Sequence, residues 1–218
     1  MSRTRIKICC IGSLEEARLA VGAGADALGL VSAMPSGPGV ISDTTIAEIA
    51  AVVPPPVASV LLTSRTDASA IAAQQRATGA SVLQLVDAVS PAAHRQLEAD
   101  LPGIRRFQVI HVRSRADIDD ALAIAPYVKG LLLDSGNPTA STPTLGGTGR
   151  VHDWTLSREI VERSSVPVFL AGGLNVGNVA EAIRTVRPFG VDVCSGVRTD
   201  RQLDADKLAA FVEAVASS

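Results

Sequence analysis

The sequence predicts an α/β fold, a single-domain (β/α)8 or TIM barrel that spans residues 1–218. Short β-branched segments alternate with Ala-rich helical segments along the whole chain. Hydrophobic residues make up 47% of the chain and aromatic residues only 3%, a composition that suits buried parallel strands under Ala-rich helices. Eight such units in 218 residues favour a closed barrel. The alternative is an open doubly wound sheet, but residues 9–13 lack the glycine pattern of a dinucleotide-binding turn.

Eight strands are expected, each a short run of β-branched and other apolar residues bounded by turn residues. In chain order these runs cover residues 5–9, 26–31, 57–62, 81–85, 107–111, 130–134, 166–171 and 191–195. Because every run is followed by a helical pattern, the strands are expected to be parallel.

Eight helices are expected between and after these strands. They open at Ser13, at Ser42 or Asp43, and at Asp67, Ser90, Ser114, Trp154, Asn175 and Asp204. Several of these residues can cap a helix, and Ser13 to Glu16 has the spacing of a capping box. The longest irregular segments, 32–41 and 135–153, follow strands, so in a barrel they lie on the catalytic face.

Composition narrows the functional classes. The formal net charge is −2, no basic run is long enough for a phosphate backbone, and aromatic stacking residues are scarce, so nucleic acid is not an expected partner. The chain has no apolar run of membrane-spanning length and no signal-peptide pattern, which predicts a cytoplasmic protein without a membrane partner. The three cysteines lack a metal-ligand spacing and are expected to be free thiols, with no metal site.

Glycine-containing turns follow the last three predicted strands and suggest a site for a small phosphate group. Backbone N–H groups in such turns bind anions without a charged side chain, and in this fold phosphate often lies beside the last strands. The residues expected to bind phosphate are Gly147, Thr148, Gly149, Gly172, Gly173, Ser195 and Gly196. The alternative is that these glycines only form tight strand-to-helix turns.

Cys9 and Asp134 end the first and sixth predicted strands, at the rim where barrel chemistry takes place. Asp134 closes a run of leucines, so desolvation should raise its pKa and favour a proton-donor role. A thiol at Cys9 would need a lowered pKa to act as a base or nucleophile. The alternatives are a buried, inert Cys9 and an Asp134 that caps a helix or holds a loop.

Lys7 shares the inward face of the first strand with Cys9, because side chains two residues apart point the same way. A lysine inside a barrel needs a carboxylate partner, and Asp192 in the last strand is the expected one. Cys10, the next residue along, is expected to point toward the outer helices. Arg113, after the fifth strand, is a further site candidate whose alternative is ordinary loop polarity.

Together these motifs resemble the phosphoribosylanthranilate isomerase family, and they do so in chain order. They are residues 7–9, 133–135, 146–149, 153–154, 170–175, 190–193 and 195–197. The resemblance implies a cofactor-free Amadori rearrangement of a phosphorylated aminoaldose in tryptophan biosynthesis, by a monomer or homodimer. It implies that Cys9 is the general base at the sugar C2 proton, that Asp134 is the general acid that helps to open the ring, and that the glycine turns hold the phosphate.

Four departures from the family pattern lie on the side of the anthranilate ring. The family usually has Gly where this chain has Cys10, an Arg near Gly39, His where Val86 stands, and Glu where Arg198 stands. The missing Arg usually contacts the anthranilate carboxylate, so its loss predicts poor turnover of phosphoribosylanthranilate.

A replacement charge could come from another loop, and the candidates are Arg65, Arg113 and Arg198. Two alternatives to the isomerase interpretation remain open. One is a paralogue that acts on another phosphate-bearing metabolite. The other is a non-catalytic barrel that binds a phosphometabolite, against which the presence of both Cys9 and Asp134 argues.

Overall fold

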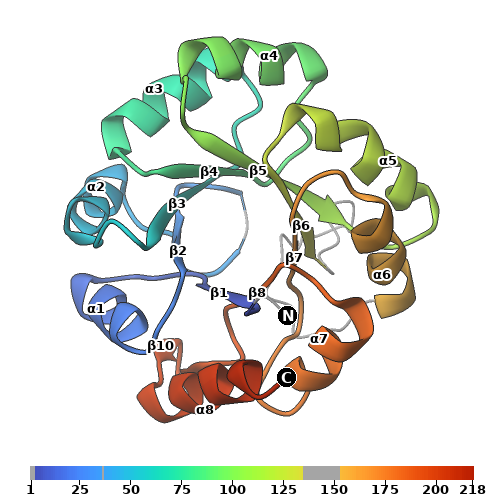
Figure 1. Cartoon of the computed structure of the whole chain (residues 1–218). Coiled ribbons are helices and arrows are strands. Elements are labelled where there is room, and N and C mark those ends of the chain that lie inside the picture. Colours follow the sequence, from blue (N-terminus) through green and yellow to red (C-terminus); the bar gives the residue numbers. More distant parts are fainter. Residues whose placement is uncertain (1–2, 36, 135–152) are drawn as a thin grey trace.

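The structure, a computed structural model, describes residues 3–35, 37–134 and 153–218. In these residues eight parallel strands close into a barrel, and helices surround it on all sides (Figure 1). The strands follow one another around the barrel in chain order, and β8 pairs with β1 to close it. The predicted (β/α)8 barrel is therefore confirmed, and the open sheet is excluded.

All eight predicted strands are present, with ends that differ from the predicted ones by at most two residues. They are β1 (Arg5–Ile8), β2 (Ala27–Val31), β3 (Ala58–Thr63), β4 (Val82–Leu85), β5 (Arg105–His111), β6 (Gly130–Asp134), β7 (Val168–Leu170) and β8 (Gly190–Val193). Their side chains are almost entirely buried because one face packs under the helices and the other fills the barrel.

The predicted helices are also present. They are α1 (Leu14–Gly22), α2 (Asp43–Val52), α3 (Ala68–Thr78), α4 (Pro91–Asp100), α5 (Ala116–Ile124), α6 (Trp154–Arg163), α7 (Val179–Val186) and α8 (Ala205–Ala216), with a 3-10 turn at Ala125–Tyr127. The predicted caps Ser13, Ser42, Asp67 and Ser90 each accept a hydrogen bond from a backbone N–H of the first turn. None of the helices in the described ranges has both the length and the apolar character needed to cross a bilayer.

Helix α7 begins later than predicted. Asn175 is the predicted start, but the carboxamide of Asn178 accepts from the Asn175 N–H, and that of Asn175 accepts from the Gly177 N–H. Side chains that bond to nearby backbone in this way form a turn that competes with a helix. The helix therefore starts at Val179.

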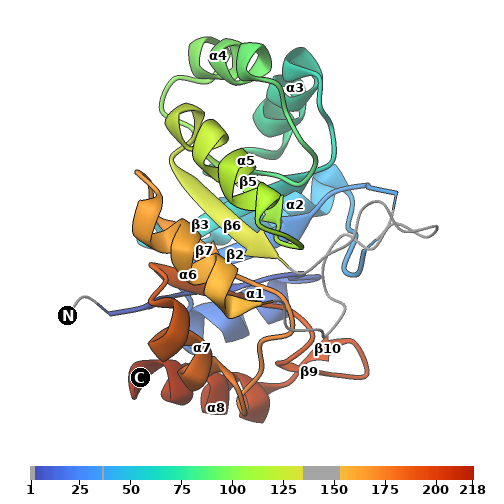
Figure 2. The same ribbon diagram turned by 90° about the vertical axis from the view of Figure 1, so that its right-hand side faces the viewer.

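A small hairpin between β8 and α8 was not predicted. Its strands are β9 (Arg198–Thr199) and β10 (Gln202–Leu203), which pair in antiparallel fashion. Figure 2 shows the hairpin on the opposite side of the molecule from the N-terminus, beyond the ends of the barrel strands. Its two-residue turn is Asp200-Arg201, which lacks the Asn-Gly or Asp-Gly signal that usually predicts such a hairpin.

Aromatic rings fill the lower part of the barrel interior. Phe107 from β5 and Phe169 from β7 pack edge to face, with ring centroids 5.1 Å apart. A Cβ at Gly130 would lie 2.3 Å from the Phe107 ring, and one at Gly190 would lie 2.5 Å from the Phe169 ring. Glycine at these two positions of β6 and β8 therefore makes room for the rings, which close the floor beneath the site.

A buried ion pair lies inside the barrel where β1 meets β8. Lys7 Nζ donates to Asp192 Oδ1 at 2.9 Å, and the two side chains are 0% and 7% exposed. Burial by itself lowers the pKa of Lys7, but the adjacent Asp192 carboxylate outweighs burial and raises this pKa above its ordinary range. The partner expected for Lys7 is thus confirmed, and Lys7 stays charged at neutral pH.

Lys7→Met should destabilise the barrel, because it leaves the Asp192 carboxylate buried without its partner. We expect the free energy of unfolding to fall by about 3–5 kcal/mol. Lys7→Met combined with Asp192→Leu removes both charges and should recover most of that loss. Urea unfolding followed by circular dichroism measures both variants, and an equal loss in the single and double variants would contradict this account.

Candidate active site

A cavity of about 80 Å³ lies at the mouth of the barrel, where the strands end. Every strand or the loop that follows it contributes lining residues, as the fold predicts for a catalytic face. Cys9, just after β1, and Asp134, at the end of β6, both line this cavity. The structure therefore brings together the two residues that the sequence analysis singled out.

The Cys9 sulfur lies beside the ammonium group of Lys7. A Cβ placed on Gly29 of β2 would be 2.8 Å from the Cys9 Sγ and 2.9 Å from the Lys7 Nζ, so both atoms border the space that this glycine leaves free. The backbone N–H of Cys9 donates to the Val193 carbonyl, which extends the pairing of β1 with β8 beyond the last strand residue. A thiolate on Cys9 would face a fixed positive charge.

Asp134 lies next to His111 across neighbouring strands, because the two residues are register partners in the β5–β6 pair. The Asp134 side chain is buried, and its expected role as a proton donor depends on this burial. Burial lowers the pKa of His111, so this imidazole is neutral at physiological pH. His111 and Gln84 of β4 also line the cavity, and neither was predicted as a site residue.

The loops after β7 and β8 form one side of the cavity. Gly172, Gly173 and Ser195 line it, and both glycines have positive φ angles, 86° and 67°, which side chains disfavour. Gly196 has a different position: a Cβ there would lie 2.1 Å from the Leu174 carbonyl oxygen, so this glycine lets the two loops touch. The predicted phosphate contacts Gly147, Thr148 and Gly149 lie outside the described residues.

Cys10 contradicts the direction predicted for it. It has φ = 63°, so the alternation of β1 ends before it, and its side chain lines the cavity instead of facing the helices. Its sulfur shares a hydrogen bond of 2.9 Å with that of Cys194, and this bond raises the pKa of Cys10 above its ordinary value. Cys10 therefore keeps its proton and is poorly suited to act as a base.

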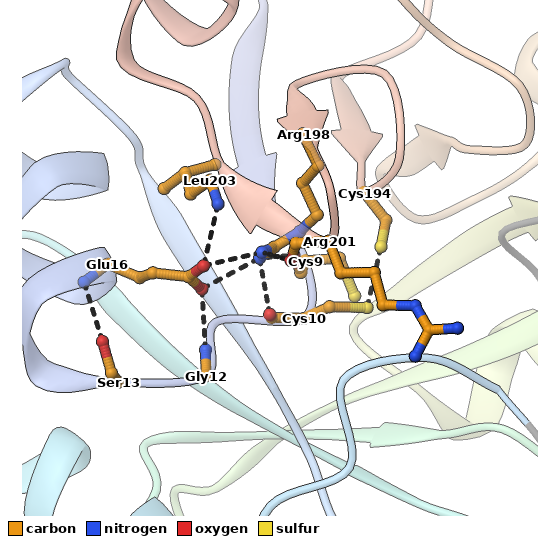
Figure 3. A network of polar contacts seen from close by, with 9 residues as sticks. All are labelled: Cys9, Cys10, Gly12, Ser13, Glu16, Cys194, Arg198, Arg201 and Leu203. Atoms are coloured by element: carbon orange, nitrogen blue, oxygen red, sulfur yellow. Dashed lines mark hydrogen bonds and ion pairs between the residues drawn. The ribbon is translucent and has the colours of Figure 1, made fainter.

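Arg198, a predicted candidate, is held by Glu16. Its guanidinium group donates to both oxygens of Glu16, at 2.7 and 3.0 Å, and also to the Cys10 carbonyl at 2.5 Å (Figure 3). The Glu16 carboxylate also accepts from the backbone N–H groups of Gly12 and Leu203. Burial raises the pKa of Glu16, but these hydrogen bonds, that of Arg198 first, outweigh burial and lower it.

This use of Glu16 differs from the predicted capping box. Ser13 does accept from the Glu16 N–H, but the Glu16 carboxylate joins three segments instead of returning to Ser13. The other two candidate arginines do not line the cavity: Arg113 donates to Asp117 within its own segment, and Arg65 lies in the loop after β3. Among the described residues, no group of three His, Cys, Asp or Glu side chains is placed to hold a metal ion.

Comparison with known proteins agrees with this geometry. Residues 6–214 match the family model for N-(5'phosphoribosyl)anthranilate (PRA) isomerase. The chain belongs to the phosphoribosylanthranilate isomerase family. A relative from Methanocella arvoryzae, named N-(5'-phosphoribosyl)anthranilate isomerase, is 35% identical over 97% of this chain and 98% of its own length.

Solved structures give the same result. The phosphoribosyl anthranilate isomerase of Thermotoga maritima has a TM-score of 0.85 and 30% identity, and the match covers 99% of this chain and 100% of that one. A second isomerase of this family was solved in complex with reduced 1-(o-carboxyphenylamino)-1-deoxyribulose 5-phosphate. It has a TM-score of 0.82 and 28% identity, with coverage of 99% and 100%.

Two of the departures from the family pattern turn out to be neighbours. A Cβ on Gly39, which has φ = 74°, would lie 2.5 Å from the Cys10 Cβ. The two positions at which the sequence analysis expects an Arg and a Gly in the family are therefore adjacent in this structure. In this chain the Cys10 side chain leaves no room for a side chain at Gly39.

Gly39→Ala should therefore destabilise the protein, by about 1–3 kcal/mol for overpacking in addition to the effect of its positive φ. Cys10→Gly removes the contacts with the Cys10 side chain and leaves the 3.0 Å approach to its Cα and the backbone effect, so the double-mutant cycle should show a coupling of about 0.5–3 kcal/mol. Gly79→Ala is the matched control, since Gly79 has φ = 64° and a Cβ there would have no heavy atom within 4 Å. Thermal unfolding of the four variants measures the coupling, and its absence would show that the two residues do not compete for space.

Proposed function

We propose that this chain is a phosphoribosylanthranilate isomerase, which converts N-(5'-phosphoribosyl)anthranilate into the corresponding 1-amino-1-deoxyribulose phosphate without a cofactor. The observation that carries the proposal is the placement of Cys9 and Asp134 on one cavity beside the loops after β7 and β8. The family membership and the ligand named for a solved relative support the substrate class.

Asp134 acts first in the proposed reaction. Its carboxyl group donates a proton to the ring oxygen of the aminoaldose, and the C1–O bond breaks as the nitrogen lone pair forms an iminium ion. A general acid needs its proton near neutral pH, which burial of a carboxyl group favours. The position of Asp134 at the closed end of the Leu131–Leu133 run supports this role.

Cys9 acts second. Its thiolate removes the proton from C2 of the open-chain iminium ion, and the electron pair forms the C1–C2 double bond of an enolamine. The enolamine takes up a proton at C1 and loses the proton of its C2 hydroxyl to give the ketone. The Lys7 ammonium group beside the sulfur stabilises the negative charge that the base carries. The reaction is a net isomerisation, so protons taken up and released balance and no redox partner is required.

The phosphate group is proposed to lie against the loops after β7 and β8. Gly172, Gly173 and Ser195 provide the described part of this site, and Gly147, Thr148 and Gly149 are proposed to complete it. Ser195→Asp should place a carboxylate near the phosphate and raise KM at least tenfold with little change in kcat, because it weakens ground-state and transition-state binding equally. Ser195→Ala is the control, because it introduces no charge. Steady-state kinetics measures KM for both variants, and an unchanged KM in Ser195→Asp would contradict this placement of the phosphate.

Cys9→Ala and Asp134→Asn test the two catalytic roles. Each should lower kcat by about 10²- to 10⁴-fold, since a general acid or base typically contributes that much. Phosphoribosylanthranilate generated in situ is the substrate, and its loss of fluorescence or the formation of product gives the rate. The effect should be in kcat and not only in KM.

The controls for this test come from the same chain. Cys10→Ala removes a thiol from the same cavity, and Asp119→Asn removes an exposed carboxylate of α5; both should keep kcat within about tenfold of the wild type, less than a general acid or base contributes. If Cys10→Ala abolished turnover and Cys9→Ala did not, the assignment of the base would be wrong. The expected cytoplasmic location and the monomeric or homodimeric state stay predictions.

A further inference from the structure

We propose that Arg201 binds the carboxylate of the substrate's aromatic amine, in place of the Arg that the family usually has near Gly39. This inference rests on the proposed function and adds a specificity-determining residue to it. Arg201 was not among the arginines considered from the sequence, because the hairpin that carries it was not predicted.

The first observation is a second hollow, of about 700 Å³, that adjoins the catalytic cavity. Five residues line both: Cys10, Gly37, Pro38, Cys194 and Ser195. The hollow therefore continues from the cavity over the loops that follow β1, β2 and β8. A ligand whose sugar phosphate occupies the cavity can extend its aromatic group in this direction.

The second observation concerns charge. The hollow is lined by three charged residues, Glu16, Arg198 and Arg201. Glu16 and Arg198 neutralise each other. The exposed Arg201 side chain makes no hydrogen bond or ion pair with any residue that the structure describes, so it leaves the hollow with one unpaired positive charge.

The third observation is the backbone of the hairpin turn. Asp200 and Arg201 have φ angles of 49° and 69°, so both adopt the left-handed conformation that favours Gly or Asn. An Arg at such a position destabilises the turn, and residues held in this way cluster at functional sites. Folding alone would favour Gly at 201.

The fourth observation is that the turn is held in place. Arg198 Nη1 donates to the Arg201 carbonyl at 2.8 Å while the same guanidinium group is fixed by Glu16. In Figure 3 the Arg201 side chain runs from the hairpin away from Glu16, toward the side on which the Cys10 and Cys194 sulfurs lie. The network thus presents Arg201 toward the shared lining of the two hollows.

Binding of two ligands tests the proposal. One is reduced 1-(o-carboxyphenylamino)-1-deoxyribulose 5-phosphate, and the other is its phenylamino analogue without the carboxyl group. Arg201→Gln should weaken binding of the first by about tenfold to a hundredfold, as loss of a charged hydrogen bond does, and change the second less than twofold. Isothermal titration calorimetry measures both dissociation constants.

Arg201→Gly separates binding from folding. Because Gly suits the left-handed backbone of the turn, this variant should raise Tm by about 2–4 °C. It should also weaken binding of the carboxylated ligand as much as Arg201→Gln does. Arg187→Gly is the matched control: Arg187 is exposed, has φ = 53°, directly follows α7 and does not line the cavity. It should raise Tm similarly and leave both ligands unaffected.

The outcomes are distinct. Two outcomes would show that Arg201 is not the carboxylate contact while the proposed function stands; in both, the wild type binds both ligands. In one, the Arg201 variants bind the carboxylated ligand as tightly as the wild type does, and in the other they lose affinity for both ligands equally. If the wild type binds neither ligand, the proposed function fails, and this inference fails with it. Selective loss of the carboxylated ligand in both Arg201 variants supports the proposal and removes the reason to expect poor turnover of phosphoribosylanthranilate.

Discussion

The ion pair between Lys7 and Asp192 is the interaction on which the site depends. Both charges are buried inside the barrel, and each would be strongly unfavourable there without the other. The pair therefore fixes β1 against β8 in one register, with Lys7 opposite Asp192. Since side chains alternate along a strand, Cys9 and Cys194, each two residues further on, follow the pair toward the mouth of the barrel. A slip of one residue would reverse the faces of the strand and remove Cys9 from the cavity.

Beyond the ends of β1 and β8, backbone conformation decides what lines the site. Cys10 takes a left-handed conformation and turns its sulfur toward Cys194 and the cavity. This side chain fills the space beside Gly39, and so the loop after β2 carries no side chain at that point. The thiol at position 10 and the absence of a side chain at position 39 are thus two parts of one steric arrangement.

Local patterns in the sequence were sufficient to predict the barrel. Apolar runs located the strands, and capping residues such as Ser42 and Ser90 marked helix starts, because both signals act over a few residues. Strand alternation also placed Lys7 on the same face as Cys9, and the predicted strand ends placed Cys9 and Asp134 at the rim of the barrel. Contacts between distant segments were not predictable: nothing near Glu16 in the sequence shows that it holds Arg198, since that contact exists only after the barrel closes. The direction of Cys10 was missed because alternation applies only as far as the strand continues.

Arg198 has a structural consequence beyond its own charge. An Arg in this partly buried position needs a carboxylate, and Glu16 provides it while also accepting from Leu203 of β10. The hairpin is therefore tied to α1 through one carboxylate, and its turn cannot relax freely. Because the backbone of this turn is already fixed in the free protein, it loses less conformational entropy when Arg201 binds an anion. The fixed turn therefore favours binding, although its left-handed backbone is unfavourable for folding. In this chain, a positive charge for the aromatic side of the site is supplied from the loop after β8, through a network in which Arg198 joins Glu16 to the Arg201 carbonyl.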